Sequence, residues 1–508
     1  MSTTLRNFPE KIKLAGLLPA AAIGLGMLSA CNVGPKYVAP AVSAPPAFKE
    51  ACGAVTAGAW QPAQPQDAAL KGKWWEMYGE PELDTLEAKL DINNQNIVHY
   101  FQNFMAARAQ VSQARAGLFP SVALDPAFTR ASTGPANANS AVSTSGRTTV
   151  NEFTLPIDVS WEPDLWGRIR NTVREYQFAA QVSAADLENE RLTEQADLAE
   201  YFFQLRGQDT LQDIYDRTVD ADRKSLDLTR AQAETGIGGE EAVAQAEVTL
   251  ADAEAARIGV AVNRALYEHA IATLIGTPAS SFSLPVKGLS TPVPAIPLGI
   301  PSQLLQRRPD IASAERAMAQ ANAVIGVATS AYYPSLSLNG SAGFASSTLP
   351  NLLSAPAFFW SLGASASEVL FDAGLRRAAV AQYTATYNAS VANYRQTVLT
   401  AFQQVEDSVA TLSILSRQIV QQDIAIQAAQ RYLEIATARY QTGLDSYLAV
   451  ISAQTTLLSD QQIQVNLRAS EMTASILLVQ ALGGGWDVSQ LPGTAQVASK
   501  ELLLSPQE

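Results

Sequence analysis

Cys31 is the residue of this 508-residue chain whose surroundings most clearly predict chemistry. It ends the stretch Leu28-Ser29-Ala30-Cys31, which follows a short basic segment and a mostly apolar run from Leu14 to Leu28. This layout is typical of a secretory signal peptide, and the apolar run is too short for a comfortable membrane span. We therefore expect residues 1–30 to be a signal peptide.

The four residues that end at Cys31 resemble a lipobox, in which the thiol receives a diacylglycerol and cleavage makes the cysteine the new N-terminus. An ordinary signal peptide with an incidental cysteine is the alternative. Two or three acyl chains hold a protein on a membrane effectively permanently. Asn32 stands where an inner-membrane retention signal would place Asp, so we expect lipid anchoring at the outer membrane.

Other reactive groups are few, and their spacing predicts no further site. Cys52 is the only other cysteine, so an internal disulfide framework is not expected, and the role of Cys52 stays open. His99 and His269 are not spaced as metal ligands, and the chain contains no GxxxxGK[ST] or GxSxG motif. We expect no enzymatic activity, no metal site and no cofactor apart from the lipid on Cys31.

The net charge is −13, and residues 1–30 contribute +2 (three basic residues against one acidic), which leaves −15 for the mature chain. A charge of this sign argues against nucleic acid as a partner. It fits a solvated exported protein or an acidic lumen that favours cations.

The chain repeats itself once. Gly167 and Gly374, Gly236 and Gly443, and Gly276 and Gly483 are each separated by 207 residues. Identical separations of this kind predict a tandem duplication of a unit of roughly two hundred residues. The proline-rich segment 277–301 joins the two copies, and its prolines favour extended backbone over helix.

Each copy contains two stretches in which apolar and polar residues alternate. They predict strands at about 119–130 and 150–163 in the first copy and at about 334–345 and 358–371 in the second. One side of each stretch carries small polar residues, and the other side carries apolar ones. This is the pattern of membrane β-strands, with apolar side chains outward and polar side chains inward.

Long helical patterns follow the strands. The 68 residues from Leu375 to Thr442 contain no glycine or proline, and their apolar residues step by three or four as in a coiled coil. The predicted seam is Val391, Tyr394, Val398, Phe402, Val405, Val409 and Leu412. We expect long helices at about 168–235 and 375–442, with return helices at about 239–275 and 445–482.

Four strands cannot close a barrel, because the smallest membrane barrels have about eight. An unclosed sheet edge in hydrocarbon leaves backbone groups unpaired, at several kcal/mol each. Several chains must therefore share one barrel, and three copies would supply twelve strands. A soluble sandwich with attached coiled coils is the less favoured alternative, because the helices alternate with the strand pairs.

Taken together, these residues resemble the outer-membrane factors of Gram-negative tripartite efflux and type I secretion, in particular their TolC/OprM/NodT-like lipoprotein branch. The pieces that carry the resemblance are "GPKYVAP" after Cys31, "WWEMYGEPELDTLEAKL", "LFPS", "DLWGRIR", "LLQRRPDIASAERAMAQANAVIGVATSAYYPSLSL", "LFDAGLRR" and "LGGGW". They occur in this order over nearly the whole mature chain.

The resemblance implies a mainly α fold with membrane β-structure. The tandem-duplicated protomer would form a homotrimer with a 12-stranded outer-membrane β-barrel, a long periplasmic α-helical barrel and a mixed equatorial belt. The expected organisation is an acylated extended segment at 31–75, a first repeat at 76–276, the linker at 277–301, a second repeat at 302–486 and a tail at 487–508.

The family's function implies a passive exit duct for drugs, other small toxic compounds or metal ions. Such a duct works with a periplasmic adaptor and an inner-membrane pump of RND type. The conduit of a type I protein secretion system is the alternative, and a periplasmic lipoprotein enzyme or structural coiled coil is a more distant one. The sequence does not identify the exported substrate.

The two hairpin turns at 235–245 and 441–452 are the expected periplasmic mouth. By the resemblance, Leu448 stands at the family's apolar constriction, with Tyr440 nearby, and Thr235, Gly236, Thr442 and Gly443 contact the adaptor. Three positions depart from the family pattern: Ser452 and Ala242 replace acidic residues, and Thr455 replaces an arginine. Glu240, Glu241 and Asp445 either replace the missing carboxylates or are solvated charges at the helix ends.

The "RRPD" stretch also has a local interpretation. Pro309 disfavours helix at Arg308, and Asp310 is expected to cap the helix that follows. We expect Arg307 and Arg308 to be structural rather than substrate-binding.

Overall fold

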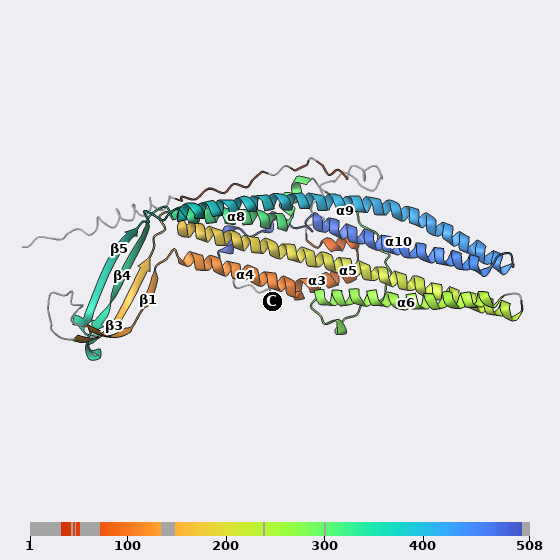
Figure 1. Ribbon diagram of the computed structural model, residues 1–508, viewed down its shortest axis with the longest axis horizontal. Coiled ribbons are helices and arrows are strands. Elements are labelled where there is room, and N and C mark those ends of the chain that lie inside the picture. The colour runs from red at the N-terminus through yellow and green to blue at the C-terminus, as the bar shows by residue number, and fades with distance from the viewer. Residues whose placement is uncertain are drawn as a thin grey trace, which may run out of the picture.

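The computed structural model describes residues 32–41, 44–45, 47–50, 72–133, 148–236, 239–298 and 301–499. The expected signal peptide at 1–30, Cys31 and Cys52 lie outside the described residues. A small sheet occupies one end of the molecule, and two long helical hairpins extend away from it to their tips at the opposite end (Figure 1).

Two helices of 67 residues each form the long axis of the molecule. They are α5 (Arg168–Glu234) and α9 (Leu375–Gln441), and each is followed by a 35-residue antiparallel helix, α6 (Glu240–Leu274) or α10 (Tyr447–Ala481). These bounds lie within two residues of the sequence-based ranges. The helices are long because each interior lacks proline and keeps an apolar stripe for its neighbours.

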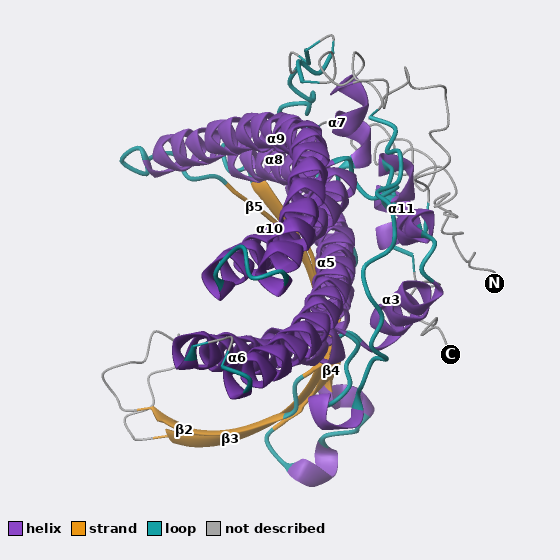
Figure 2. Ribbon diagram, turned by 90° about the vertical axis from the view of Figure 1, so that its right-hand side faces the viewer, coloured by secondary structure: helices purple, strands orange, loops and turns teal. Residues whose placement is uncertain are grey.

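Shorter helices fill the space between the return helices and the sheet. α4 (Gln95–Ala116) packs against α5, and α8 (Pro309–Ser330) packs between α5 and α9. α4 continues the direction of α6 toward the sheet, and α8 continues that of α10 (Figure 1). The helical layer as a whole is curved like a crescent (Figure 2). The sequence analysis did not separate α4 or the neighbouring α3 (Pro81–Asn93) from the rest of the first repeat.

The sheet is antiparallel throughout and contains β1 (Ser121–Leu124), β2 (Ala127–Thr133), β3 (Thr148–Trp161), β4 (Ser335–Ser346) and β5 (Phe358–Ser367). Its order is β1-β3-β4-β5, and β2 continues the line of β1 along β3. The predicted first strand is divided at Asp125-Pro126, where proline cannot donate a ladder hydrogen bond.

The main hydrophobic core lies halfway along the rods. Phe48, the 3₁₀ helix η3 (Trp74–Tyr78), α3 and linker residues such as Ile296 pack there against α5, α9 and α10. Most of the predicted seam of α9 is buried, and Val398, Val405 and Val409 have no exposed surface. This arrangement agrees with the equatorial belt that the resemblance implies.

Buried charges attach the linker to the helices. The Arg206 guanidinium, 2% exposed, donates to the Pro285 carbonyl at 2.7 Å and forms ion pairs with Glu82 and Asp209. Asp209 also accepts from Arg264 at 2.7 Å and from the Lys287 amide at 3.0 Å. Buried ions are tolerated because they are paired and hydrogen-bonded, so this cluster fixes where the linker crosses α5.

The remaining described elements are short. They are η5 (Ala279–Ser281), η6 (Pro301–Gln303), α7 (Leu304–Arg307), η7 (Leu349–Asn351), η8 (Ala355–Ala357), η9 (Val488–Gln490) and α11 (Thr494–Val497). Within the described ranges, none of the helices combines the length and apolarity needed to cross a membrane.

Candidate functional site

The sheet has one polar face and one apolar face. Ser341 is paired with Asp158 on β3 and with Ser361 on β5, so these side chains share the polar face. The neighbouring register positions carry large apolar side chains, and Trp360 and Leu362 are 68% and 81% exposed. Apolar side chains this exposed need a further apolar surface or lipid to cover them.

Both edges of the sheet are open among the described strands. β1 and β2 pair only with β3, and β5 pairs only with β4. Each strand runs antiparallel to its neighbour, so the β5 edge and the β1/β2 edge run in opposite directions. The β1/β2 edge therefore has the strand direction that would continue an antiparallel ladder beside β5.

The sheet is joined to the long helices by two aspartates. Asp164 accepts hydrogen bonds from the Ile169 and Arg170 amides at 3.1 and 2.9 Å, at the start of α5. Asp372 accepts from the Gly374 and Arg376 amides at 2.9 and 3.2 Å, at the start of α9. Each carboxylate satisfies free amides at a helix N-terminus, so both rods are fixed at the sheet in the same way.

The described N-terminal segment begins at the same junction. The Asn32 Oδ1 atom accepts a hydrogen bond from the Asn171 Nδ2 atom at 2.9 Å, and Gly34 lies against Gly326 of α8. Residue 32, which directly follows the expected lipid attachment site Cys31, is thus held beside the sheet.

The two hairpin tips lie side by side and enclose a cavity of about 400 Å³. Of the predicted mouth residues, Glu241, Tyr440, Gly443, Asp445 and Leu448 line it. Five others do not line it: Thr235, Gly236, Glu240, Thr442 and Ser452, all of which are exposed. Leu448 is 60% exposed, so within one protomer it is available for contact with other copies.

Asp445 is engaged by an arginine of its own hairpin. Arg439 donates to the two carboxylate oxygens at 2.6 and 3.1 Å, and this guanidinium holds the pKa of Asp445 below its usual range. Arg439 was not predicted, because the family pattern places an arginine at position 455. The available signal was an opposite charge six residues away across a glycine turn.

Tyrosine packing also marks the second tip. The rings of Tyr440 and Tyr447 are 5.2 Å apart, and Tyr447 is 4% exposed. They belong to an apolar cluster that includes Leu226 of α5 and Ala246 of α6, and so connects the two hairpins. Tyr440 was predicted to lie at the mouth, whereas Tyr447 was not predicted.

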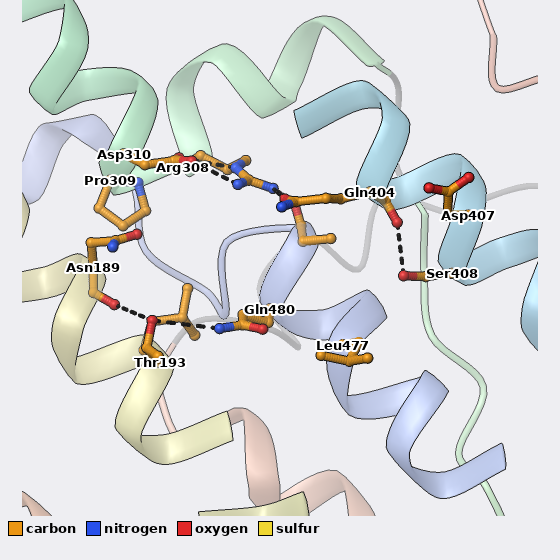
Figure 3. A pocket seen from close by; sticks show the side chains of 12 residues that line it. Asn189, Thr193, Arg308, Pro309, Asp310, Gln404, Asp407, Ser408, Leu477 and Gln480 are labelled. Carbon is orange, nitrogen blue, oxygen red and sulfur yellow. Dashed lines mark hydrogen bonds and ion pairs between the residues drawn. The ribbon is translucent and has the colours of Figure 1, made fainter. Parts of the chain in front are cut away.

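A second polar cavity of about 400 Å³ lies where the end of α10 meets the start of α8 (Figure 3). The Arg308 guanidinium donates to Asp310 at 2.7 and 3.0 Å, to the Gln404 Oε1 atom at 2.8 Å and to the Ala481 carbonyl at 3.0 Å. Arg308 therefore joins three helices.

The expected capping role of Asp310 was wrong. α8 begins at Pro309, and Arg308 is its N-cap residue, so Asp310 lies inside the first turn. Its carboxylate accepts from the Ile311 amide at 2.8 Å and from Arg308. Proline is favoured at the first helical position because its missing N–H is not needed there.

No group of three or more His, Cys, Asp or Glu side chains in the described ranges is arranged to hold a metal ion. The fold and the open sheet define a class of protein: a duplicated strand-and-hairpin protomer whose sheet has two open edges among the described strands.

The chain belongs to the outer membrane efflux protein family. The model of that family matches residues 88–277 and again residues 300–484. The chain is 31% identical over 475 residues to the antibiotic efflux pump outer membrane protein ArpC of Pseudomonas putida, which covers 92% of this chain and 96% of that protein. It is also 31% identical over 475 residues, with the same coverage of each chain, to the toluene efflux pump outer membrane protein TtgC of Pseudomonas putida.

Solved structures share the fold. The outer-membrane channel OprN superposes with a TM-score of 0.82 at 27% identity, over 90% of this chain and 100% of that chain. CusC superposes with a TM-score of 0.78 at 25% identity, over 89% of this chain and 100% of that chain.

Proposed function

We propose that this protein is the outer-membrane exit channel of a tripartite efflux pump. It passively conducts drugs, other small toxic compounds or metal ions that an inner-membrane transporter delivers through a periplasmic adaptor. The names of ArpC and TtgC, which concern antibiotic and toluene efflux, favour small compounds over the proteins carried by type I secretion.

The observation that carries this proposal is the two-faced sheet with two open edges. Three copies joined edge to edge give a closed barrel of twelve strand positions, with apolar side chains toward lipid and serine-rich side chains toward the lumen. Closure removes the unpaired backbone groups that would otherwise face hydrocarbon.

The helices carry matching apolar stripes for the same trimer. α6 and α9 lie at opposite margins of the crescent (Figure 2). Exposed apolar side chains occur along both helices: Val248, Ile258, Val262 and Leu266 on α6, and Leu399, Ile414, Val420 and Ile424 on α9. Head-to-tail contact buries one stripe against the other and continues the barrel as a helical tunnel.

A lipid on Cys31 would anchor the channel beside its barrel. Asn32 is held at the base of the sheet, so acyl chains attached one residue earlier would enter the membrane there. We expect Cys31→Ala to fold and trimerise, because the barrel itself spans the membrane, and to reach the outer membrane more slowly. Recovery of the unlipidated protein as a soluble periplasmic monomer would contradict the barrel.

The hairpin tips are the proposed docking site for the adaptor, and the transporter is proposed to be of RND type. Thr235, Gly236, Thr442 and Gly443 are exposed at the end of the molecule farthest from the sheet (Figure 1). Leu448 would restrict the resting mouth, with Tyr440, Ser452, Asp445, Glu240 and Glu241 around it, and adaptor contact would widen it.

The barrel is tested with two neighbouring residues of β5 that face opposite sides of the sheet. Leu362→Arg places a charge on the lipid face, at a cost of about 2–4 kcal/mol in each protomer, and should prevent insertion of the trimer. Ser361→Arg places the same charge in the lumen and should leave insertion intact while lowering cation conductance in a planar bilayer.

The reverse outcome, tolerance of Leu362→Arg and loss of insertion with Ser361→Arg, would show that the faces are misassigned. A detergent-extracted monomer without conductance would end the channel proposal.

A further inference from the structure

Four buried polar atoms without a hydrogen-bond partner in the described part of the chain gather where the two hairpins meet, near their tips. They are Asp222 Oδ1 of α5, Gln454 Oε1 of α10 and the hydroxyls of Tyr440 and Tyr447. Such groups are rare in folded proteins, because each loses its water without replacement. Their concentration at one contact between α5, α9 and α10 points to a functional arrangement.

Asp222 is the charged member of this cluster. It is 2% exposed and lies between Val219 and Leu226 on the buried stripe of α5. Ser225 lies on the same helix and accepts a hydrogen bond from the Gln454 Nε2 atom at 3.5 Å. This contact places Gln454 of α10 beside this part of α5. The nearby wall is apolar and aromatic, and it includes Val450 of α10.

The charged side chains of α6 beside this part of α5 form ion pairs with other α5 residues. Three ion pairs join α6 to α5: Glu247 with Arg230 at 2.7 Å, Glu254 with Arg223 at 3.1 Å, and Arg257 with Asp216 at 2.5 Å. All six side chains are about half exposed. α9 and α10 contribute the phenol rings of Tyr440 and Tyr447. No cation in the described ranges forms an ion pair with Asp222, and Lys224 beside it on α5 is exposed.

We infer that Asp222 is a positioning residue of the periplasmic mouth, which allows α10 to pack on α5 while it is neutral and loosens that contact when it ionises. A carboxylate in an apolar wall lacks the solvation it has in water, whereas the carboxylic acid loses much less. Ionisation therefore favours separation of the second hairpin from the first, where water can reach the charge.

The direction with pH follows from the burial. Burial raises the pKa of Asp222 to about 6. Because the pKa is raised in the packed state, the contact is strongest at low pH and weakens as pH rises through about 6. Between pH 5 and 7.5 the ratio of separated to packed hairpins should therefore rise by about tenfold at most.

The inference rests on the proposed channel function only for its effect on conduction, so the first measurement concerns the hairpins alone. Spin labels are placed on both exposed tips through Thr235→Cys and Thr442→Cys, in the full-length protein carrying Cys52→Ser. Pulsed electron resonance gives the distance distribution between pH 5 and 7.5. We expect the longer distances to increase with pH, with a midpoint near 6.

Asp222→Asn removes the charge at nearly constant shape, so its distances should not change with pH and should be at least as short as those of the parent at pH 5. Asp222→Leu should behave in the same way. Agreement between the two variants would show that the result does not depend on hydrogen bonds made by the introduced amide. Asp227→Asn is the matched control, because Asp227 is exposed on the same helix five residues later. It should follow the parent protein.

A parent distribution that does not change with pH, or an Asp222→Asn variant that still follows the parent, would overturn the inference. Single-channel conductance separates this result from the larger proposal. If the distances respond as expected and no variant conducts, the inference stands and the channel proposal fails. If all variants conduct with identical pH dependence, the channel stands and the role of Asp222 fails.

Discussion

The two hairpin tips begin with the same backbone conformation and carry different side chains. Gly236 and Gly443 each have φ of +74°, and the hydroxyls of Thr235 and Thr442 donate to the carbonyls of Ala231 and Ala438 at 3.2 and 3.1 Å. The Thr-Gly pair that ends each long helix therefore has the same conformation in both halves.

The positions around these turns have diverged. At the 207-residue offset, Arg439, Tyr440, Tyr447 and Leu448 of the second tip correspond to Gln232, Ala233, Glu240 and Glu241 of the first. The second tip thus holds an ion pair, a tyrosine pair and an exposed leucine, whereas the first tip presents two carboxylates at the N-terminus of α6. We therefore expect the second hairpin to form the proposed mouth and the first to support it.

The largest loss of stability should come from replacing the equivalent glycines at the ends of the two return helices. Gly276 and Gly483 have φ of +66° and +96°, and an added Cβ would clash with the carbonyl oxygen of Asn93 or of Arg307. Alanine at either position should lower the free energy of unfolding by about 2–4 kcal/mol, measured by thermal unfolding. Gly443→Ala has the same kind of φ in open space and should cost about 1 kcal/mol. Equal costs at all three positions would show that the backbone contacts do not matter.

The next largest effect is a difference in stability between the two tips. Tyr447→Ala removes a buried ring and should destabilise the second tip by about 2–4 kcal/mol, seen as faster amide exchange over 440–455. Tyr447→Phe should change exchange little, because the hydroxyl lacks a hydrogen-bond partner. Glu240→Ala at the equivalent position of the first tip should have an effect below about 1 kcal/mol, since it loses only a helix-end charge. Equal responses of the two tips would contradict their specialisation.

A functional difference should appear at Leu448. Leu448→Ala widens the mouth if this residue restricts it, so single-channel conductance should rise. Leu444→Ala is the control, because Leu444 lies on the same turn and is 70% exposed but does not line the cavity. Unchanged conductance in Leu448→Ala rules out Leu448 as the restriction.

The smallest effect is expected from Arg439→Gln, which gives the second tip the residue of the first. The exposed pair with Asp445 should contribute little, and salt should weaken it. Since Arg439 lowers the pKa of Asp445, the contribution is present at neutral pH and is lost as pH falls through that lowered pKa. Amide exchange at 442–446 should therefore differ between variant and parent at pH 7 and converge in acid. A difference that persists in acid would exclude the ion pair as its cause.

Local pattern was sufficient to predict the long elements. The absence of proline between residues 375 and 442 and the apolar seam predict α9, and the alternating residues predict β3, β4 and β5, because both periods depend only on the neighbouring chain. The 207-residue spacing predicted that the second half would repeat the first. Asp310 was misassigned because Pro309 itself takes the first helical position, which makes Arg308 the N-cap residue.

Candidate site residues were predicted less completely. The turn residues Thr235, Gly236, Thr442 and Gly443 follow from sequence, because a helix–helix turn favours glycine. Arg439 and Tyr447 were missed, since their partners are defined by the geometry of the turn and by packing against the other hairpin. Asp222 left a weak signal, a charge between Val219 and Leu226 on an apolar stripe.

The sequence by itself determined the duplication, the lengths of the rods, the two faces of the strands and the expected lipid site at Cys31. Only the tertiary structure decided that β3 pairs with β4 across the repeat boundary, which leaves two open sheet edges. It also decided that Asp222 is enclosed by both hairpins. The reason is that strand pairing and burial depend on residues far apart in the chain, whereas the periodicity of a sequence reflects only neighbouring residues.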